Sequence, residues 1–389
     1  MSVLKIKRAI EAVYYIFRDA TGAIPANKKS DKELWLVSER GFDARDNAYH
    51  LYKWMCYNHP EIDCIYVIGK NDTDYKKIKD LPNGKTVRQG SSEHFRLMCN
   101  ADALVSTHAY GWSPNMPIYA HLVRKNMFKP KGVQVFLQHG VSDKDTEWLY
   151  YENFKPDLFI VSTYPEEKIV KELYKQPDDA VALTGMCRFD NLTDESSSSE
   201  KLILFMPTWR QWLSGGSQYE FIDSDYYLRI QKVLENETLQ NMLKQNNTKL
   251  LFYPHIEMQK YIYCFAGGDN VEVLDASSAD VQDLLKKSNL LITDYSSVYF
   301  DFLYMNKPIL FYQWDKPKFT SAHYKGVLSD YESVGFVSYT KDDLIEDIKD
   351  YFEGERKKGA DSIFKYHDTE NCKRVFEEIE ETIKKNKRR

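Results

Sequence analysis

Short runs of apolar, β-branched and aromatic residues recur along the chain, separated by stretches of helix length that mix polar and apolar residues. The runs lack the clean period-two alternation of a strand with one face in water, so we expect strands covered on both faces, as in a parallel sheet. The pattern therefore predicts an α/β protein with two doubly wound parallel sheets. The predicted strands are 33–40, 63–69, 101–109, 132–140, 156–163 and 181–186 in the first set, and 201–208, 249–255, 271–276, 289–294, 308–312 and 335–340 in the second.

The segment NLTDESSSSEK at 191–201 separates the two sets, and its serines and charged residues offer nothing to bury. A chain of 389 residues with 43% hydrophobic residues is long and apolar enough for two cores. We therefore predict one domain at 1–195 and a second at 196–364. The residues from about 365 to 389 predict an amphipathic helix, ending in KKNKRR, that could pack back on the first domain.

Composition narrows the class of protein. The net charge is only -5, and no basic stripe with interleaved aromatic residues is visible, so we expect no nucleic-acid partner. Six cysteines lie far apart without a CxxC pair, which favours a reducing compartment. No apolar run approaches the roughly 20 residues of a membrane span, and charged residues interrupt any signal-peptide core. We expect a cytoplasmic protein.

Polar residues gather where one apolar strand ends. In LITDYSSVYFDF at 291–302 the strand ends near Thr293, and Asp294, Ser296 and Ser297 follow it. Ligands of open parallel sheets bind beyond the carboxyl ends of the strands, where helix N-termini favour anions. Hydroxyl groups and backbone amides at this point would suit a phosphate. The alternative is an ordinary N-cap, because Ser, Thr and Asp are common there for stability alone.

Three further strand ends carry side chains of this kind: His139 in FLQHG, His255 in FYPH and Arg210 in MPTWR. A single histidine at a strand end is more often structural than catalytic. Because these residues are expected at the ligand-binding edges of two sheets, we predict that they converge on a cleft between the domains.

Together, QHG, PTWR, YPH, TDYSSVYFDFLYMNKPILFY and TGMCRFDNL resemble the motifs of the CDP-glycerol glycerophosphotransferase family, the teichoic acid primases and polymerases of Gram-positive bacteria. The resemblance spans roughly residues 35–345 and implies a GT-B-like fold of two Rossmann-type domains facing a cleft. The implied reaction transfers a polyol phosphate from CDP-glycerol or CDP-ribitol to a hydroxyl of a polyprenyl-linked saccharide or growing polymer, with release of CMP.

This resemblance implies roles for single residues. His139 is the general base that takes the proton of the attacking hydroxyl, which suits an imidazole with an ordinary pKa of about 6.5. His255 and Arg210 hold the donor pyrophosphate, since phosphoryl transfer asks chiefly for alignment and charge stabilisation. The two aspartates at the phosphate turn orient Arg210, His255 or a donor hydroxyl. The implied donor-binding residues are Thr208, Thr293, Asp294, Ser296, Ser297 and Asp301.

The resemblance places the acceptor in the first domain, where Asp46, Asn47 and His108 are the expected contacts. The alternatives are that Asp46 caps a helix and that His108 is a packed ring. DTD at 72–74 and DSD at 223–225 match a metal-binding DxD pattern, but both lie in polar segments away from the motif strand ends. We expect no essential metal and no cofactor.

A membrane surface is a further expected partner. The first eighteen residues predict an amphipathic helix of net charge +3, and RKNMFKPK at 124–131 adds cations around Met127 and Phe128, which we expect to be exposed. Since the implied acceptor is a lipid, we expect peripheral attachment to the anionic inner face of the cell membrane. The alternative is that the first helix packs on its own domain.

Other functions remain open on the sequence. A nucleotide-sugar GT-B glycosyltransferase or epimerase would favour a Glu-rich ribose-binding motif where this chain has DYSS and FDF. A non-catalytic scaffold is disfavoured by the presence of His139, Arg210 and His255. The start of the first strand near residue 33 favours a single transferase module.

Overall fold

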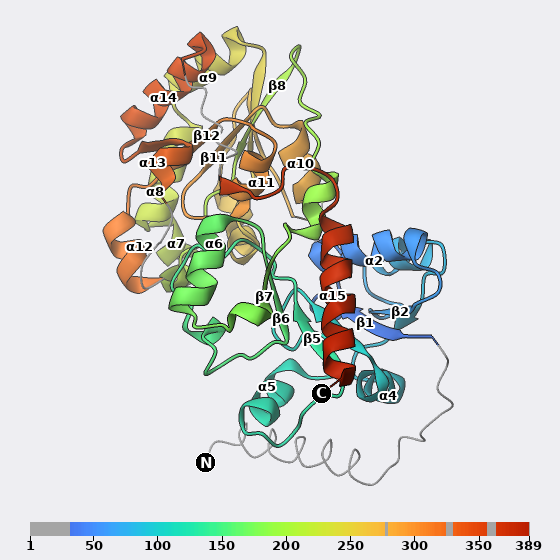
Figure 1. Cartoon of the computed structure of the whole chain (residues 1–389). Coiled ribbons are helices and arrows are strands. Elements are labelled where there is room, and N and C mark those ends of the chain that lie inside the picture. The colour runs from blue at the N-terminus through green and yellow to red at the C-terminus, as the bar shows by residue number, and fades with distance from the viewer. Residues whose placement is uncertain (1–31, 277–278, 324–329, 356–362, 389) are drawn as a thin grey trace, which may run out of the picture. The chain divides into compact units, whose positions relative to one another are not determined.

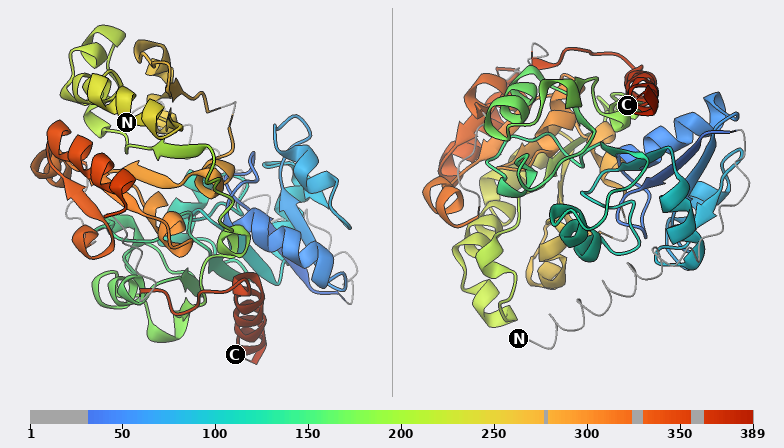
Figure 2. Two further views of the ribbon diagram at one scale, coloured as in Figure 1. Left: turned by 90° about the horizontal axis from the view of Figure 1, so that it is seen from above. Right: turned by 60° about the horizontal axis from the view of Figure 1, so that its bottom comes forward.

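The computed structural model describes residues 32–276, 279–323, 330–355 and 363–388. The chain forms two compact units. The first takes the chain up to Val141 together with Glu147–Asp190 and Asp368–Arg389, and the second takes Ser142–Thr146 and Asn191–His367. Each unit is built on one sheet with helices packed around it (Figure 1, Figure 2).

The sheet of the first unit has seven strands in the order β3-β2-β1-β4-β5-β6-β7, and its neighbouring strands are parallel. Along β1, Trp35 and Val37 lie in one buried core and Leu36 in another, so both faces of the sheet are covered. The strands are β1 (Leu34–Ser38), β2 (Asp63–Val67), β3 (Thr86–Val87), β4 (Ala103–Ser106), β5 (Val133–Phe136), β6 (Leu158–Val161) and β7 (Val181–Leu183). The helices are α2 (Asn47–Asn58), α3 (Tyr75–Lys79), α4 (Ser92–Asn100), α5 (Met116–Arg124), α6 (Tyr164–Lys168) and α15 (Asn371–Arg388), with short turns η1 (Glu147–Leu149), η2 (Ile169–Leu173), η3 (Asp178–Ala180) and η4 (Cys187–Asn191).

The sheet of the second unit has six strands in the order β10-β9-β8-β11-β12-β13, again paired in parallel. Leu290 and Ile292 of β11 lie in the main core, and Leu291, which alternates with them, is also fully buried. The strands are β8 (Lys201–Phe205), β9 (Thr248–Phe252), β10 (Val271–Val273), β11 (Leu290–Thr293), β12 (Ile309–Tyr312) and β13 (Phe336–Ser338). The helices are α7 (Gln218–Ile222), α8 (Asp225–Leu234), α9 (Glu237–Gln245), α10 (Val281–Lys287), α11 (Val298–Tyr304), α12 (Lys316–Ala322), α13 (Tyr331–Val334) and α14 (Lys341–Glu353), with turns η5 (Gln211–Leu213) and η6 (Ile256–Cys264).

The two predicted parallel sheets are confirmed, and every predicted apolar run overlaps a strand of the structure. The sequence pattern missed β3. Thr86 and Val87 make up this whole strand, and only Val87 is buried. A single buried residue produces no periodic signal, because periodicity needs several residues.

The helix α15 follows the second unit in the sequence but packs into the core of the first. Phe376 stacks on Trp35 of β1 with the ring centroids 5.3 Å apart. The polar residues of the helix lie on its opposite face, as expected for an amphipathic helix. Its buried residues include Cys372, Val375, Phe376, Ile379 and Ile383.

The Ser-rich segment between the predicted domains is tied to the second unit by two ion pairs. Asp194 Oδ1 lies 2.8 Å from Lys307 Nζ, and Glu195 Oε1 lies 2.5 Å from Lys286 Nζ. Lys307 is buried and also donates to the carbonyl oxygens of Lys286 and Ser288, at 2.6 and 2.9 Å. Lys307, the lysine of MNKP, therefore caps the C-terminal end of α10, where the last carbonyl oxygens of a helix need hydrogen-bond donors.

The predicted membrane-facing segments are only partly described. No helix in the described part of the chain is both long and apolar enough to span a bilayer. The amphipathic helix expected in the first eighteen residues lies outside the described residues. In the loop after α5, Met127 is 58% exposed, as expected. Phe128, in contrast, is half-buried and packs against Tyr119, with ring centroids 5.2 Å apart.

Asp190 holds the start of α15 in place. Its Oδ1 accepts a hydrogen bond from the backbone N–H of Asn371 at 2.8 Å, and its Oδ2 accepts one from that of Cys372, also at 2.8 Å. We expect Asp190→Ala to weaken the docking of α15, because both donors lose their acceptor. Loss of such a cap costs about 0.5–2 kcal/mol, so amide hydrogen exchange in α15 should accelerate roughly 2- to 30-fold.

The matched control is Glu381→Gln on the same helix, because Glu381 and Lys385 form an exposed pair that contributes little. Unchanged protection of α15 in the Asp190→Ala variant would show that Asp190 does not hold the helix.

Candidate functional site

The polar residues predicted in the second domain, together with Asp315, which was not predicted, follow four neighbouring strands of its sheet. Arg210 follows β8, His255 follows β9, Asp294–Ser297 follow β11, and Asp315 follows β12. Because these strands are parallel, all four segments leave the same carboxyl edge of the sheet. We call this edge the donor edge.

Two carboxylates hold Arg210. Its Nη2 donates to Asp294 Oδ2 at 2.9 Å, and its Nε and Nη2 donate to Asp315 Oδ2 and Oδ1 at 2.7 and 3.0 Å. Its Nη1 donates to the carbonyl oxygen of Thr208 at 2.6 Å. Asp294 Oδ1 in turn accepts from the backbone N–H groups of Thr208 and Tyr295, at 2.8 and 2.6 Å. One network therefore joins the ends of β8, β11 and β12.

The guanidinium group of Arg210 is fully buried. Burial opposes its charged form, but Asp294 and Asp315 raise the pKa of Arg210 above its ordinary value, so the side chain stays cationic. With no exposed surface and with its donors engaged, Arg210 cannot also contact a pyrophosphate in this structure. This arrangement suits a positioning role better than the predicted direct contact with the donor. Four rings lie with their centroids 5.0–5.4 Å from its central carbon, those of Tyr226, Tyr295, Trp314 and Phe319.

The predicted phosphate turn has a buried part and a half-buried part. Thr293 is fully buried, and its hydroxyl donates to the carbonyl oxygen of Met206 at 2.7 Å. Ser296 and Ser297 are half-buried where α11 begins. Ser297 occupies the N-cap position, but its side chain makes no capping hydrogen bond. An N-cap role therefore does not account for Ser297, and these two serines retain surface for a ligand.

Two buried polar atoms at the donor edge have no hydrogen-bond partner among the described residues, Thr208 Oγ1 and Gln313 Oε1. Gln313 follows β12, and its Nε2 donates to the carbonyl oxygen of Asp294 at 2.9 Å. Buried polar groups are nearly always paired, so unpaired ones point to a water or a ligand. The position of Thr208 therefore fits a donor-binding role. Asp301, in contrast, is buried within α11.

His255 is oriented by the turn that it begins. Its Nδ1 accepts a hydrogen bond from the backbone N–H of Glu257 at 3.2 Å, at the start of η6. In the neutral ring the proton is therefore on Nε2, which can donate to an anion. Burial lowers the pKa of His255 below its ordinary value, although Glu257 and Asp294 oppose this shift. The ring is therefore neutral at pH 7, with an Nε2–H that can donate.

In the first unit, His108 and His139 follow the neighbouring strands β4 and β5. Their rings stack with centroids 4.8 Å apart and 12° between the planes. Burial, with His139 and Arg40 nearby, lowers the pKa of His108 to about 3. Burial of the ring also lowers the pKa of His139, against the opposing effect of Asp46, although the residue as a whole is exposed. Both rings are therefore neutral at pH 7.

The backbone directly before His139 is left-handed. Gln138 has φ +60°, a conformation that residues other than glycine rarely adopt. Its Nε2 donates to the carbonyl oxygen of Ile160 at 2.9 Å and to Glu166 Oε1 at 2.8 Å. Asn47 Nδ2 donates to the Gln138 carbonyl oxygen at 2.9 Å. These hydrogen bonds stabilise a backbone conformation at Gln138 that is unfavourable in free energy. They thereby fix the direction of the chain after β5 and the position of His139.

The predicted acceptor residues Asp46 and Asn47 have structural partners. Asn47 is fully buried, and its Oδ1 accepts from the backbone N–H of Arg188 at 3.0 Å. Both ends of the Asn47 amide are thus engaged within the protein, so in this structure its amide is not presented to an acceptor. Asp46 is the N-cap of α2, as the alternative reading had it, and its Oδ1 also pairs with Arg188 Nη1 at 2.9 Å.

Sequence reasoning missed three charged residues at these edges. Arg188 lies inside TGMCRFDNL, and its Nη1 donates to the carbonyl oxygen of His139 at 3.1 Å. Glu39 is the first residue after β1, and burial, with Asp46 and Asp43 nearby, raises the pKa of Glu39 to about 8. Asp315 lies three residues after β12. The available signal was a charge shortly after an apolar strand for Glu39 and Asp315, and a place inside a family motif for Arg188.

No group of three or more His, Cys, Asp or Glu side chains in the described ranges is arranged to hold a metal ion. In DTD, Asp72 and Asp74 accept hydrogen bonds from the backbone N–H groups of Gly69 at 2.6 Å and Ala44 at 3.2 Å. In DSD, Ser224 is the N-cap of α8. Residues of both triplets therefore have structural hydrogen bonds, those of Asp74 reaching the loop after β1.

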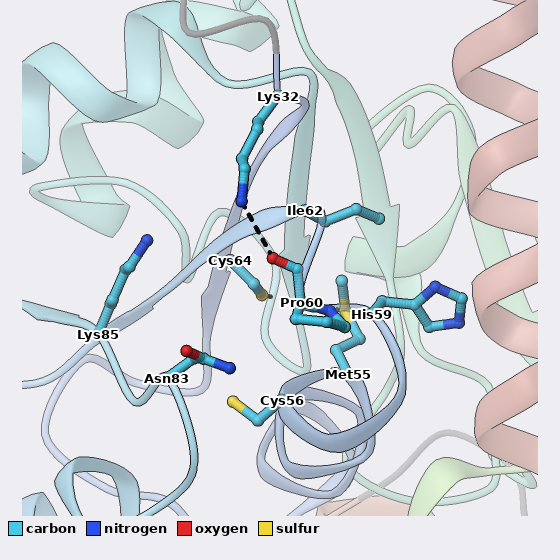
Figure 3. A pocket seen from close by; sticks show the side chains of 9 residues that line it. All are labelled: Lys32, Met55, Cys56, His59, Pro60, Ile62, Cys64, Asn83 and Lys85. Atoms are coloured by element: carbon cyan, nitrogen blue, oxygen red, sulfur yellow. Dashed lines mark hydrogen bonds between the residues drawn. The ribbon is translucent and has the colours of Figure 1, made fainter.

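A pocket of the first unit lies where α2 ends and β2 begins (Figure 3). This is the amino edge of the sheet, opposite the strand ends that carry His108 and His139. Because ligands of parallel sheets bind beyond the carboxyl ends, the pocket does not belong to the candidate site. Its lining residues are Lys32, Met55, Cys56, His59, Pro60, Ile62, Cys64, Asn83 and Lys85.

Comparisons with known proteins agree with the motifs. The minor teichoic acid biosynthesis protein GgaB of Bacillus subtilis (strain 168) is 34% identical over 367 residues, which cover 90% of this chain and 40% of GgaB. The chain thus spans less than half the length of that relative. The teichoic acid glycerol-phosphate transferase of Staphylococcus aureus (strain NCTC 8325 / PS 47) is 24% identical over 351 residues, with 84% of each chain covered.

Among solved structures, the wall teichoic acid polymerase TagF superposes with a TM-score of 0.64 at 17% identity, covering 99% of both chains. At this identity the likeness shows the fold alone. A sequence profile of the CDP-Glycerol:Poly(glycerophosphate) glycerophosphotransferase family matches residues 23–381. The resemblance of the motifs is therefore confirmed, and the chain belongs to the CDP-glycerol:poly(glycerophosphate) glycerophosphotransferase family.

Proposed function

We propose that the chain transfers a polyol phosphate, glycerol phosphate foremost, from a CDP-activated donor to a hydroxyl of a lipid-linked saccharide or teichoic-acid-like polymer, releasing CMP. Membership of the family and the names of the relatives support this reaction. The observation that carries the proposal is the donor edge, where the unpaired hydroxyl of Thr208 and the half-buried serines lie beside a buried arginine–carboxylate network.

Each donor-edge residue has a separate role in this proposal. The hydroxyls of Thr208, Ser296 and Ser297 bind the donor diphosphate, and His255 donates its Nε2–H to it. Prearranged donors of this kind stabilise the charge that develops on the leaving group. Arg210 acts through Asp294, which holds the backbone of Thr208 in place.

His139 acts as the base. A lone pair on the acceptor oxygen attacks the phosphorus that carries the polyol, and the hydroxyl proton passes to a nitrogen of the His139 ring. The bond between that phosphorus and the bridging oxygen breaks, and CMP leaves with the electron pair. A neutral imidazole is the form that can accept the proton, and the lowered pKa of His139 keeps it in that form.

Purified protein, incubated with a synthetic lipid-linked disaccharide and either CDP-glycerol, CDP-ribitol or a UDP-sugar, tests this proposal. Release of CMP from CDP-glycerol, with the product heavier by one glycerol phosphate, is expected. Turnover of CDP-ribitol alone would make the chain a ribitolphosphotransferase. Turnover of the UDP-sugar alone, or of none of the three, would contradict polyol-phosphate transfer.

We also propose that the protein works in the cytoplasm, peripherally bound to the anionic inner face of the membrane. The loop after α5 supports this partner, since exposed Met127 lies among exposed cations. Apolar and cationic side chains together favour an anionic bilayer surface. The cations are Arg124, Lys125, Lys129 and Lys131.

His139→Ala should lower kcat about 10²- to 10⁴-fold, the usual contribution of general base catalysis, and leave the Kd for CDP-glycerol unchanged. In the wild type, kcat should stay level as the pH falls from 8 to about 6.5 and decrease only below that, because the pKa of His139 lies below its ordinary value. The control is His121→Ala on α5, an exposed histidine. Loss of donor affinity in the His139→Ala variant would contradict this role.

Arg210→Ala should destabilise the second unit by about 3–5 kcal/mol, because Asp294 and Asp315 lose their buried countercharge. His255→Ala should cost only the about 0.5–2 kcal/mol of a lost cap, because it leaves no buried charge unpaired, and should weaken binding of CDP-glycerol. Urea unfolding and calorimetric titration of both variants measure the two effects. An Arg210→Ala variant of wild-type stability with weakened donor binding would instead favour direct contact.

Removal of divalent metal should leave the rate of CMP release unchanged, because hydroxyl and N–H donors stabilise the leaving group in this proposal. The measurement compares turnover in excess EDTA with turnover after Mg²⁺ or Mn²⁺ is added back. A loss of more than about tenfold in EDTA that Mg²⁺ restores would show that a metal ion takes part.

A further inference from the structure

An arginine with no assigned role lies at the carboxyl edge of the first sheet. Arg40 is the second residue after β1, and its side chain is 45% exposed. Its Nε donates to Asp43 Oδ2 at 2.7 Å, and its Nη2 donates to the same oxygen. The central guanidinium carbon lies 4.9 Å from the ring centroid of Phe42, which is itself 50% exposed. The carboxylate and the ring fix the guanidinium in one orientation.

This guanidinium keeps donors for a ligand. Of its five N–H groups, Asp43 takes two, and the other three have no partner among the described residues. These N–H groups can donate but not accept hydrogen bonds, and their planar arrangement matches the oxygen atoms of a phosphate group. A neutral sugar hydroxyl would gain less binding free energy from this guanidinium, because it has no negative charge to strengthen the hydrogen bond.

Contacts link Arg40 to the proposed base. The carbonyl oxygen of its neighbour Glu39 lies 3.4 Å from Ser106 Oγ, and the same hydroxyl accepts from the backbone N–H of His108 at 3.1 Å. The ring of His108 in turn stacks on that of His139. The charge of Arg40 also lowers the pKa of both histidines, which places it near them.

We propose that Arg40 determines acceptor specificity by binding a phosphate group of the acceptor close to the hydroxyl that His139 deprotonates. The preferred acceptor is then a chain end that already carries polyol phosphate, and a neutral saccharide end is disfavoured. The half-exposed ring of Phe42 offers an apolar surface to the carbon atoms of the polyol. This inference rests on the proposed function, because it takes the surroundings of His139 as the acceptor side.

Two soluble acceptors test it: a disaccharide that carries one glycerol phosphate unit and the same disaccharide without it. Arg40→Gln should raise KM for the phosphate-bearing acceptor about 10- to 150-fold, the value of a lost charge-assisted hydrogen bond. KM for the neutral acceptor and Kd for CDP-glycerol should change less than twofold. Arg40→Lys should fall between the wild type and Arg40→Gln, because lysine keeps the charge without the fork.

The matched control is Arg45→Gln. Arg45 lies on the same loop and is 48% exposed, and its Nε donates to Asp74 Oδ2 at 2.7 Å. The substitution removes the same charge and should leave both KM values within twofold of the wild type. Equal increases in the Arg40 and Arg45 variants would show a general charge effect and overturn the proposal. Equal increases for both acceptors in Arg40→Gln would do the same.

A binding measurement separates this inference from the proposed function. The phosphate-bearing disaccharide is titrated calorimetrically into the wild type and into Arg40→Gln with no donor present. Binding that Arg40→Gln weakens at least tenfold supports the inference even if the wild type releases no CMP, in which case the proposed function alone fails. Binding that does not depend on Arg40 overturns the inference whatever the turnover.

Discussion

The ion-pair network of Arg210 with Asp294 and Asp315 is the constraint on which the donor edge depends. A charge that leaves water for a protein interior costs several kcal/mol unless opposite charges accompany it. Arg210 and Asp294 can therefore be buried only together, and Asp315, whose side chain is 13% exposed, supplies the second carboxylate. This explains why motifs about a hundred residues apart occur in one chain: PTWR supplies the cation, TDYSS supplies one carboxylate, and the segment after β12 supplies the other. Their mutual attraction sets the spacing of the strand ends, and hence of the hydroxyls that follow them.

The two sheet edges meet opposite chemical demands. In the proposed reaction the donor edge needs fixed hydrogen-bond donors, and the buried network holds the segments that carry them in place. The edge of the first unit then needs a group that gains and loses a proton, and His139 is an exposed residue there. Here rigidity comes from the backbone, because Gln138 is held in a left-handed turn, Asn47 binds its carbonyl oxygen and Arg188 binds that of His139. The imidazole itself stays accessible.

Much of this arrangement could be predicted from the chain. Apolar runs without alternation indicated both sheets, and parallel pairing placed every polar strand end at one edge of its sheet. The burial of single residues was not predictable in the same way. Arg210 and His255 both follow strands, but the rings around Arg210 come from α8, α12 and the segments that follow β11 and β12. Asn47 is likewise a polar residue at a helix start, and only the path of the chain after β5 shows that its amide is enclosed.

The position of α15 has a consequence for biosynthesis. This helix completes the core around Trp35, yet the ribosome makes it only after all six strands of the second sheet. Until then, the apolar surface of the first unit that α15 covers stays exposed on the nascent chain. Domains generally fold as units in the order of synthesis, and the first unit departs from that order. The first unit therefore cannot complete its core until α15 has been synthesised. Until then it exposes apolar surface of the kind that chaperones bind.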